Sequence, residues 1–422
     1  MWPKWTNIPW CALSSNGFMM PRLRILIGGG TGFVGTALAT SLRRKGHDVK
    51  IVSRYLRPSA KDFTWQNVLD PKGGDFTWDD IERDGLPATD AVINLAGSNM
   101  LDFKKLWTCK YKEECVSSRV STTKLLAKAI SESDDPPSVW ISTSAVNFYP
   151  PSKEHEYDET VSVFPERDWA SKLCVDIEDA ADIPDPEART RSVVMRTGIV
   201  LGQGGGEYDP LEMQSGGVYD KIRTPFYCCL GGTFGDGSQW FPYVHLTDVV
   251  RAYEFAILDN RPRGPLNLVA PTACTNKEFT KALGKAMKRP TVLRVPKFMS
   301  ALMGKERGSM FFSGQHVKPN VLNSMGFEFN YPDVTRCCRG CVYGGYLNKS
   351  WCMMIVHFLF ITTVYDPAES VLFWTCVYEL IICFLSFILF SCIKVRSSNW
   401  NRNTVKMKSY RISIYEILMY CV

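Results

Sequence analysis

A cluster of glycines between two short strands constrains this chain more than any other feature. Arg24 to Ile27 predict a buried strand, and glycines follow at positions 28, 29, 30, 32 and 35. An amphipathic helix then runs to Gly46, and residues 49–53 predict a second strand. Strand, glycine turn, helix and strand form a βαβ unit of about 30 residues, which is the setting that a dinucleotide-binding fingerprint requires. A turn that is merely tight does not need so many glycines.

The glycines also indicate where the phosphates of a dinucleotide would lie. Glycine permits a positive φ in the turn, leaves room for a pyrophosphate, and lets the helix pack closely on its strand. The free N–H groups at the start of the helix then face the phosphates, and the helix dipole favours negative charge there. We therefore expect this loop to contact a cofactor through Gly29, Thr31, Gly32, Phe33, Val34 and Gly35.

The end of the second strand favours one cofactor over another. Folds that select NAD place Asp or Glu about 20 residues after the glycines, where the carboxylate holds the ribose 2′-hydroxyl. Ser53 and Arg54 stand there instead. A guanidinium pairs with a 2′-phosphate through two hydrogen bonds, whereas a carboxylate would repel it. The sequence therefore predicts NADP(H), the alternative being that Arg54 is only a solvated surface residue.

Charge and cysteine content limit the partners, the metal or disulfide sites and the location that can be expected. The 422 residues carry a net charge of +6, but nine Lys/Arg and four Asp/Glu lie from Thr335 onward, which leaves 40 against 39 before it. The nearly neutral globular part gives no reason to expect nucleic acid as a partner. Eight of the 15 cysteines lie in the last 88 residues, and the others show no spacing typical of metal sites or disulfide pairs. We expect free thiols, no metal and an intracellular location, cytoplasmic or mitochondrial.

The order of predicted elements indicates an α/β fold. Strands at 91–95, 138–143 and 192–196 alternate with helices at 106–131, 168–181 and 249–258. This alternation predicts a doubly wound parallel sheet of the Rossmann type with a smaller α+β cap. We divide the chain into an extension (1–21), a dinucleotide-binding domain (22–263), a cap (264–334) and an atypical tail (335–422).

Several motifs together resemble a known family. They are the glycine loop, Asn94-Leu-Ala-Gly97, Ser144, the run from Arg196 to Gly202, and Gly235-x-Gly237-x-Gln239-Trp240. This set resembles the extended short-chain dehydrogenases/reductases and, more narrowly, the "epimerase family protein" group (family 39U) with its C-terminal domain of unknown function. The resemblance covers about residues 22–334. It implies an NADP(H)-binding Rossmann domain, a cap over a small-molecule substrate, and cofactor contacts at Ser53, Arg54, Leu95, Ala96, Glu114, Arg119 and Val200.

The catalytic helix departs from the wider superfamily. Those enzymes carry Tyr-x-x-x-Lys on a helix, where the lysine lowers the tyrosine pKa and a serine on the preceding strand holds the substrate oxygen. Here Lys172 is in place, but Asp168 occupies the tyrosine position. A literal match, Tyr149 to Lys153, is interrupted by two prolines and is better interpreted as a loop. The candidate catalytic set is therefore Ser144, Lys172 and, as a substitute for the missing phenol, Tyr149.

Substrate contacts are expected from the glycine-rich loop before residue 248. Gln239 and Trp240 are the first candidates, because this loop would lie over the cofactor cleft. His245 either positions a substrate or contributes to a helix N-terminus, and the sequence does not separate these alternatives. Asp248 is expected to cap that helix.

The two ends of the chain are ambiguous. Residues 1–20 lack acidic side chains, as targeting presequences do, or they are an extension without a structural role. Val371 to Ile393 contain one charge in 23 residues, which is long enough to span a bilayer, and six Lys/Arg follow by Arg411. The tail is therefore either a membrane anchor, the protein's only membrane contact, or an aberrant terminus that replaces a native last helix.

Two functional hypotheses follow. The first is an NADP(H)-dependent oxidoreductase or nucleoside-sugar-epimerase-like enzyme acting on an unidentified substrate. The second is a catalytically inactive protein that senses NADP(H) or scaffolds a partner. The missing helix tyrosine favours the second, and the cap with Gln239, Trp240 and His245 favours the first.

Overall fold

A seven-stranded parallel sheet forms the centre of the protein. We describe a computed structural model, which covers residues 10–13, 19–56, 74–100, 105–161, 168–184, 189–203, 217–296, 298 and 305–343. The strand order is β13-β9-β7-β6-β3-β4-β5, and every neighbouring pair is parallel. The predicted doubly wound sheet is thus confirmed. Its strands are β3 (Arg24–Gly28), β4 (Asp48–Ser53), β5 (Phe76–Thr77), β6 (Ala91–Asn94), β7 (Val139–Ala145), β9 (Arg191–Thr197) and β13 (Gly264–Leu268).

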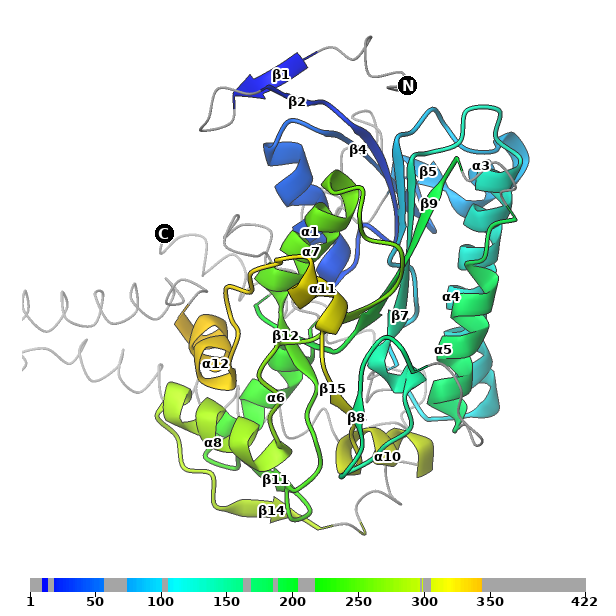
Figure 1. Ribbon diagram of the computed structural model, residues 1–422. Helices are drawn as coiled ribbons and strands as arrows, with labels where there is room; N and C mark the ends of the chain where they lie inside the picture. The colour runs from blue at the N-terminus through cyan, green and yellow to red at the C-terminus, as the bar shows by residue number, and fades with distance from the viewer. Residues whose placement is uncertain are drawn as a thin grey trace, which may run out of the picture. The chain divides into compact units, whose positions relative to one another are not determined.

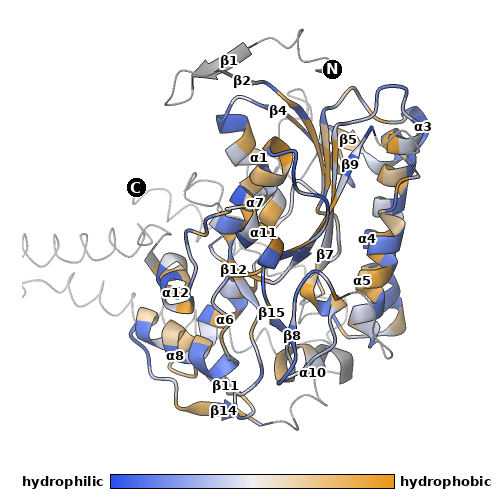
Figure 2. Cartoon of the chain, in the orientation of Figure 1, coloured by the Kyte–Doolittle hydropathy of each residue, from blue (hydrophilic) through white to orange (hydrophobic). Residues whose placement is uncertain are grey.

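Helices cover both faces of this sheet (Figure 1). Helices α1 (Phe33–Arg44) and α7 (Leu246–Leu258) pack on one face and bury an aliphatic cluster around Leu38, Ile27 and Val249. Helices α3 (Trp78–Asp84), α4 (Cys109–Ser131) and α5 (Trp169–Ala180) lie on the other face. Apolar residues concentrate on the central strands, and hydrophilic residues mark the outward sides of α4 and α8 (Figure 2). This pattern matches the period of 3.6 residues by which an amphipathic helix covers a core.

The cap is assembled from separated parts of the chain. Helices α6 (Val218–Tyr227), α8 (Asn276–Met287) and α12 (Val334–Tyr343) share an apolar cluster that includes Phe226, Phe279 and Cys338. Strand β15 of the cap pairs with β8 of the dinucleotide-binding part, and β10 pairs with β12 in a second small sheet. These remaining elements are η3 (Val146–Phe148), β8 (Glu156–Tyr157), β10 (Ile199–Leu201), β11 (Gly232–Phe234), β12 (Tyr243–His245), β14 (Leu293–Val295), α10 (Lys305–Phe312), β15 (His316–Val317) and α11 (Asn320–Ser324).

Both predicted boundaries of the cap shift in the structure. Strand β13 begins at Gly264 and pairs with β9 over its whole length, so the sheet extends past the expected limit at residue 263. Helix α12 buries Cys337, Cys338 and Cys341 against the cap, so the globular part continues beyond the expected limit at residue 334. Here free cysteine acts as a small apolar side chain.

The ends of the chain fall largely outside the described residues. Strands β1 (Trp10–Leu13) and β2 (Met19–Pro21) form an antiparallel pair within the predicted extension. Val371 to Ile393, the expected membrane anchor, is not among the described residues. Within the residues that are described, no helix combines the length and apolar character needed to cross a bilayer.

Candidate functional site

A cleft of about 470 Å³ lies between the carboxyl ends of the sheet strands and the cap. Its sheet side is formed by the glycine loop, by residues after β6, and by Thr143 and Ala145 of β7. Its cap side is formed by α6, α8 and the segments around Trp240 and Gly314. In open α/β sheets ligands bind at this edge, where the strand order reverses, here between β3 and β6.

The glycine loop has the geometry that the sequence predicts. Gly29 has φ of +73°, and a Cβ atom there would lie 2.7 Å from the backbone of Ala96. At Gly35 a Cβ atom would lie 2.5 Å from the carbonyl oxygen of Gly29, so only glycine lets α1 start this close to the turn. By contrast, a Cβ atom on Gly32 would meet only that oxygen, at 3.3 Å. Gly32 is also the N-cap of α1, and no side chain caps the helix there. An open helix N-terminus therefore faces the cleft, as a phosphate site requires.

The contacts expected after β6 and on α4 gather at the same place. Leu95 and Arg119 line the cleft, as do Phe33, Val34 and Val200, and Ala96 lines a smaller recess of about 240 Å³ with several of the same neighbours. The Arg119 guanidinium donates to the carbonyl oxygen of Cys115 at 3.0 Å and lies close to Gly97. Burial lowers the pKa of Arg119. Arg119 makes no ion pair with a described residue, which makes it suited to an anionic ligand.

Several charged side chains gather near the end of β4 and the start of α4. Ser53 is buried at the end of β4 and donates to the carbonyl oxygen of Tyr55, whereas Arg54 is exposed and makes no ion pair with a described residue. Glu114 accepts from Lys105 at 3.0 Å and from Ser98 at 3.0 Å. These bonds, and the charges of Lys105 and Arg54, lower the pKa of Glu114. Thr31, Ser53, Arg54 and Glu114 do not line the cleft itself, and Arg57 is outside the described residues.

Two of the three predicted catalytic residues, Tyr149 and Ser144, form hydrogen bonds with residues that do not line the cleft. Tyr149 is completely buried, its hydroxyl lies 2.9 Å from Asn267 Oδ1, and it accepts from Arg196 at 2.9 Å. Burial raises the pKa of Tyr149. Ser144 donates to Glu178 at 2.8 Å, and Glu178 also pairs with Arg196. Ser144 lines only the smaller recess, and Tyr149 lines neither hollow. This buried polar network holds β7, α5 and β9 together.

The third residue, Lys172, does not line the cleft and is exposed. The reason lies at the start of α5. Asp168, in the position expected for the tyrosine, is outside the helix as its N-cap, and its Oδ1 accepts from the backbone N–H of Ser171 at 2.8 Å. The structure therefore does not bring Ser144, Tyr149 and Lys172 together in the cleft.

His245, and not Asp248, caps helix α7. His245 is the N-cap of α7: its Nδ1 accepts from the N–H of Thr247 at 3.2 Å, and its ring packs 3.8 Å from that of Tyr331. Asp248 is fully buried and accepts from the backbone N–H groups of Asn330 and Tyr331. His245 does not line the cleft, so its predicted contact with substrate is not supported.

The other substrate candidates do line the cleft. Gln239 is buried there, and the Trp240 ring stacks on His316 at 4.0 Å while its Nε1 donates to the carbonyl oxygen of Lys153. Five cap residues that share this wall were not predicted, because their approach depends on tertiary packing. They are Asn276, Phe279, Thr280, Phe311 and Gln315. A local signal exists only for Gln315, which follows a glycine in the cap.

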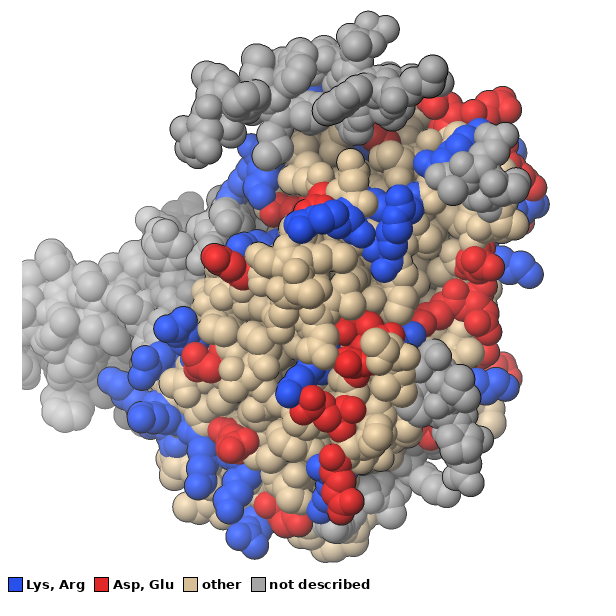
Figure 3. All heavy atoms as spheres, in the orientation of Figure 1, with Lys and Arg blue, Asp and Glu red and all other residues tan. Residues whose placement is uncertain are grey.

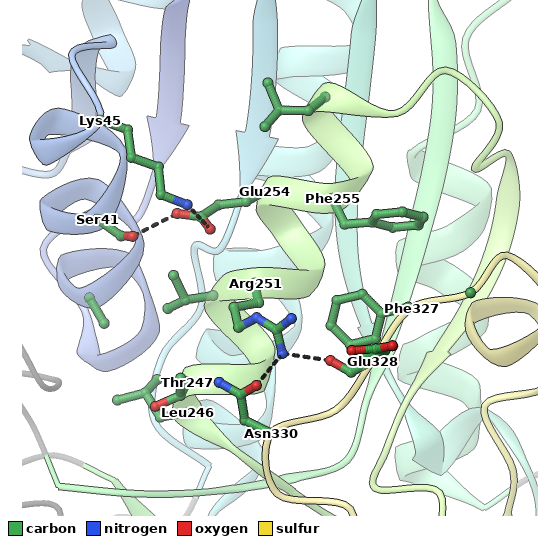
Figure 4. Close-up of a pocket in the computed structure, with 14 residues that line it drawn as sticks. Ser41, Lys45, Leu246, Thr247, Arg251, Glu254, Phe255, Phe327, Glu328 and Asn330 are labelled. Atoms are coloured by element: carbon green, nitrogen blue, oxygen red, sulfur yellow. Dashed lines mark hydrogen bonds and ion pairs between the residues drawn. The ribbon is translucent and has the colours of Figure 1, made fainter. Parts of the chain in front are cut away.

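A second hollow of about 590 Å³ lies between α1, α7 and residues 326–330 (Figure 4). Glu254 accepts from Ser41 and Lys45, both at 2.6 Å. Arg251 donates to the backbone carbonyl oxygen of Glu328 and to Oδ1 of Asn330. None of the predicted cofactor residues lines this hollow. These hydrogen bonds hold α1, α7 and the segment 326–330 together.

Comparison with known proteins shows the family of this chain. The model of the NAD dependent epimerase/dehydratase family matches residues 25–268, and that of a domain of unknown function, DUF1731, matches residues 295–340. The chain belongs to the NAD dependent epimerase/dehydratase family. The family match ends at the last residue of β13 and so follows the sheet. The second match extends into α12, past the expected end of the cap.

Similar proteins are known from animals and bacteria. The chain is 38% identical to "Epimerase family protein SDR39U1" of Mus musculus over 321 residues, which is 76% of this chain and 100% of that protein. A crystal structure of human epimerase family protein SDR39U1 (isoform 2) with NADPH superimposes with a TM-score of 0.67 at 35% identity, covering 76% of this chain and 99% of that one. UDP-glucose 4-epimerase of Thermotoga maritima with UDP-glucose, at 17% identity and a TM-score of 0.58, shares the fold, covering 78% and 100%.

Proposed function

We propose that the protein binds NADP(H) in the cleft and acts as an oxidoreductase or epimerase-like enzyme on a small molecule held by the cap. The observation that carries the proposal is the open N-terminus of α1 at Gly32, in one cleft with the desolvated guanidinium of Arg119. The similar human protein was crystallised with NADPH, which supports the choice of cofactor.

The residues present fit this cofactor in two ways. The glycine loop leaves room for a pyrophosphate at Gly32, and Arg119 supplies a cation in the same cleft. Arg54 offers an exposed guanidinium at the end of β4, where a 2′-phosphate would lie. Bound there, the nicotinamide would exchange a hydride with a carbinol or carbonyl carbon of the substrate.

The chain itself must provide a proton acceptor or donor for that exchange. Among the described residues that line the cleft, only Arg119 and Asp168 carry a charged group. A guanidinium stays protonated at neutral pH, so Asp168 is the described residue able to take up a proton. We assign this role to Asp168 in place of the tyrosine that its position would hold in a typical short-chain dehydrogenase.

Cofactor binding and its selectivity can be tested first. We expect titration by nicotinamide fluorescence to show tighter binding of NADPH than of NADH. Arg54→Glu should weaken NADPH binding by about 10- to 100-fold and leave NADH binding nearly unchanged, because a charged pair becomes a repulsion. Arg289→Ala, an exposed cation of the cap, is the matched control and should change neither. Equal effects of Arg54→Glu on both cofactors would contradict the assignment.

A second function rests on the absence of a phenol–lysine pair from the described part of the cleft. Under this alternative the protein binds NADP(H) without turning it over and acts as a sensor or scaffold. A screen for NADPH oxidation separates the two. Turnover that Asp168→Asn abolishes, with NADPH affinity retained, supports the enzyme, whereas tight binding without turnover on any carbonyl substrate supports the sensor.

A further inference from the structure

Gln239 presents an unused hydrogen-bond acceptor to the cap side of the cleft. Only 5% of this residue is exposed, and its Nε2 donates to two backbone carbonyl oxygens, Phe234 at 3.0 Å and Phe311 at 2.9 Å. These two acceptors fix the orientation of the amide, since a flipped amide would bring three oxygens together. Oε1 makes no hydrogen bond with any of the described residues. It is therefore the atom that Gln239 offers to a ligand.

Gln315 repeats the same arrangement on a neighbouring segment. It is also 5% exposed, and its Nε2 donates to the carbonyl oxygen of Tyr149 at 3.0 Å. Its Oε1 likewise makes no hydrogen bond with a described residue, and the residue lines the same cleft as Gln239. Neither oxygen is among the fully buried polar atoms without a partner, so each keeps an accessible face. Two accessible acceptors in one cleft, each fixed by the hydrogen bonds of its own amide, suit a ligand that donates hydrogen bonds.

Helix α8 adds two further neutral groups to this wall. Asn276 uses its Oδ1 to accept from the N–H of Phe234 at 3.0 Å, and its Nδ2 has no hydrogen-bond partner in the described part of the chain. Thr280 is one turn further along α8 and is 2% exposed, and its hydroxyl makes no hydrogen bond to a residue that the structure describes. Both residues line the cleft beside the ring of Phe279. The described cap wall therefore combines acceptors, a donor and a hydroxyl with aromatic surface.

The charges of α8 lie on its opposite side. Lys277, Lys281 and Lys285 are exposed at intervals of four residues, and blue side chains gather along this edge of the molecule (Figure 3). None of them lines the cleft. The only described cation that does is Arg119, which stands on α4 beside the glycine loop. The N-terminus of α6 also reaches the cleft, but Gly217 contacts Phe33 of α1 and so lies at the cofactor end.

We propose that the substrate is an uncharged molecule with at least two hydroxyl groups on an apolar skeleton, and that it is not a nucleoside diphosphate sugar. Its hydroxyls would donate to Oε1 of Gln239 and of Gln315, and would also bond to Nδ2 of Asn276 and to the hydroxyl of Thr280. Its apolar face would pack on Phe279 and Trp240. A diphosphate placed among neutral amides and aromatic rings would lose its hydration without gaining a cation. The proposal rests on the proposed function, since it takes the cofactor to fill the other half of the cleft.

The test compares two classes of probe on the full-length protein loaded with NADP⁺. The uncharged probes are inositols, methyl glucosides, and alkyl and aryl 1,2-diols of increasing size; the charged probes are UDP-glucose, UDP-glucuronic acid and GDP-mannose. Binding is measured by thermal shift and confirmed by calorimetry. We expect saturable binding of at least one uncharged probe and none of the charged ones.

Two variants locate the binding. Thr280→Val removes one hydroxyl without changing shape, and Asn276→Asp keeps the bond to the N–H of Phe234 while replacing the free donor. Each should weaken binding of the uncharged probe by about 5- to 10-fold, the value of one hydrogen bond, without changing NADPH affinity. Lys281→Ala, on the outer side of α8, is the matched control and should have no effect.

Three results would overturn the proposal: binding of the charged probes, binding of neither class, or uncharged binding that both variants leave unchanged. Failure of NADPH to bind is a separate result, which refutes the proposed function. In that case the same probes, applied to the cofactor-free protein, still test the cap wall.

Discussion

Replacing Tyr149 with phenylalanine distinguishes a structural from a catalytic hydroxyl. The Tyr149 hydroxyl accepts from Arg196 at 2.9 Å and lies 2.9 Å from Asn267 Oδ1 and 3.0 Å from the carbonyl oxygen of Asp158. The Arg196 side chain is only 4% exposed, so water cannot replace the lost partner. Leaving the buried Arg196 N–H without its acceptor costs about 1.5–3 kcal/mol. Losing the contacts of the hydroxyl with the oxygens of Asn267 and Asp158 adds about 1 kcal/mol. We therefore expect Tyr149→Phe to lower the free energy of unfolding by about 2–4 kcal/mol.

The assay is urea unfolding followed by circular dichroism, with the midpoint temperature as a second readout. A loss of this size corresponds to a shift of roughly 5–10 °C for a domain of a few hundred residues. Tyr227→Phe, which removes a half-exposed hydroxyl, should shift the midpoint by less than about 1 °C. NADPH affinity should change little, because Tyr149 does not line the cleft. Unchanged stability together with lost turnover on a confirmed substrate would show instead that the hydroxyl is catalytic.

Three further substitutions probe other parts of the molecule. Gly35→Ala should lower the free energy of unfolding by roughly 2–4 kcal/mol and weaken NADPH binding by more than about tenfold, since its methyl group would lie 2.5 Å from a backbone oxygen. Gly32→Ala should weaken NADPH binding with little change in the free energy of unfolding. Thermal melts and titrations in which Gly32→Ala is the less stable of the two variants would contradict the loop geometry. Burial raises the pKa of Glu159, whose Oε2 has no hydrogen-bond partner among the described residues. Its contribution to stability is therefore complete below the ordinary pKa near 4.3 and is lost as pH rises through the raised value. Glu159→Gln should thus stabilise the protein by about 1 kcal/mol at pH 8, an advantage that denaturation curves should show shrinking towards pH 4; a pH-independent difference would refute this account. Asp248→Asn places an amide donor against the N–H groups of Asn330 and Tyr331 and should cost about 2 kcal/mol in urea unfolding, whereas an unaltered midpoint would mean that these bonds contribute nothing.

Local patterns predicted the parts of the fold that depend on local chemistry. The glycine loop and the alternating strands and helices lie where periodicity and turn residues indicate, because those signals reflect short-range geometry. Strand β13 was assigned to the cap instead, since Pro265 weakens a strand pattern. The structure tolerates this proline because β13 is an edge strand, paired only with β9.

The substrate half of the site could be predicted only in part. Gln239 and Trp240 were found because they stand in a glycine-rich loop, and both line the cleft. The roles of Tyr149 and His245 depend on long-range partners, Arg196 and Tyr331, which no local pattern indicates. The change of composition at Thr335 likewise suggested the end of the domain, whereas α12 uses its cysteines as core residues.

The start of helix α5 restricts which substitutions evolution can accept at Asp168. Asp168 caps that helix, and an N-cap acidic residue contributes about 1 kcal/mol that a tyrosine cannot replace. A mutation that placed tyrosine there would lose the cap at once. It would gain no catalytic pair in return, because Lys172 is exposed and does not line the cleft. Acquiring the phenol–lysine chemistry would thus require at least two substitutions, the first of them harmful, and selection would tend to keep the protein without it.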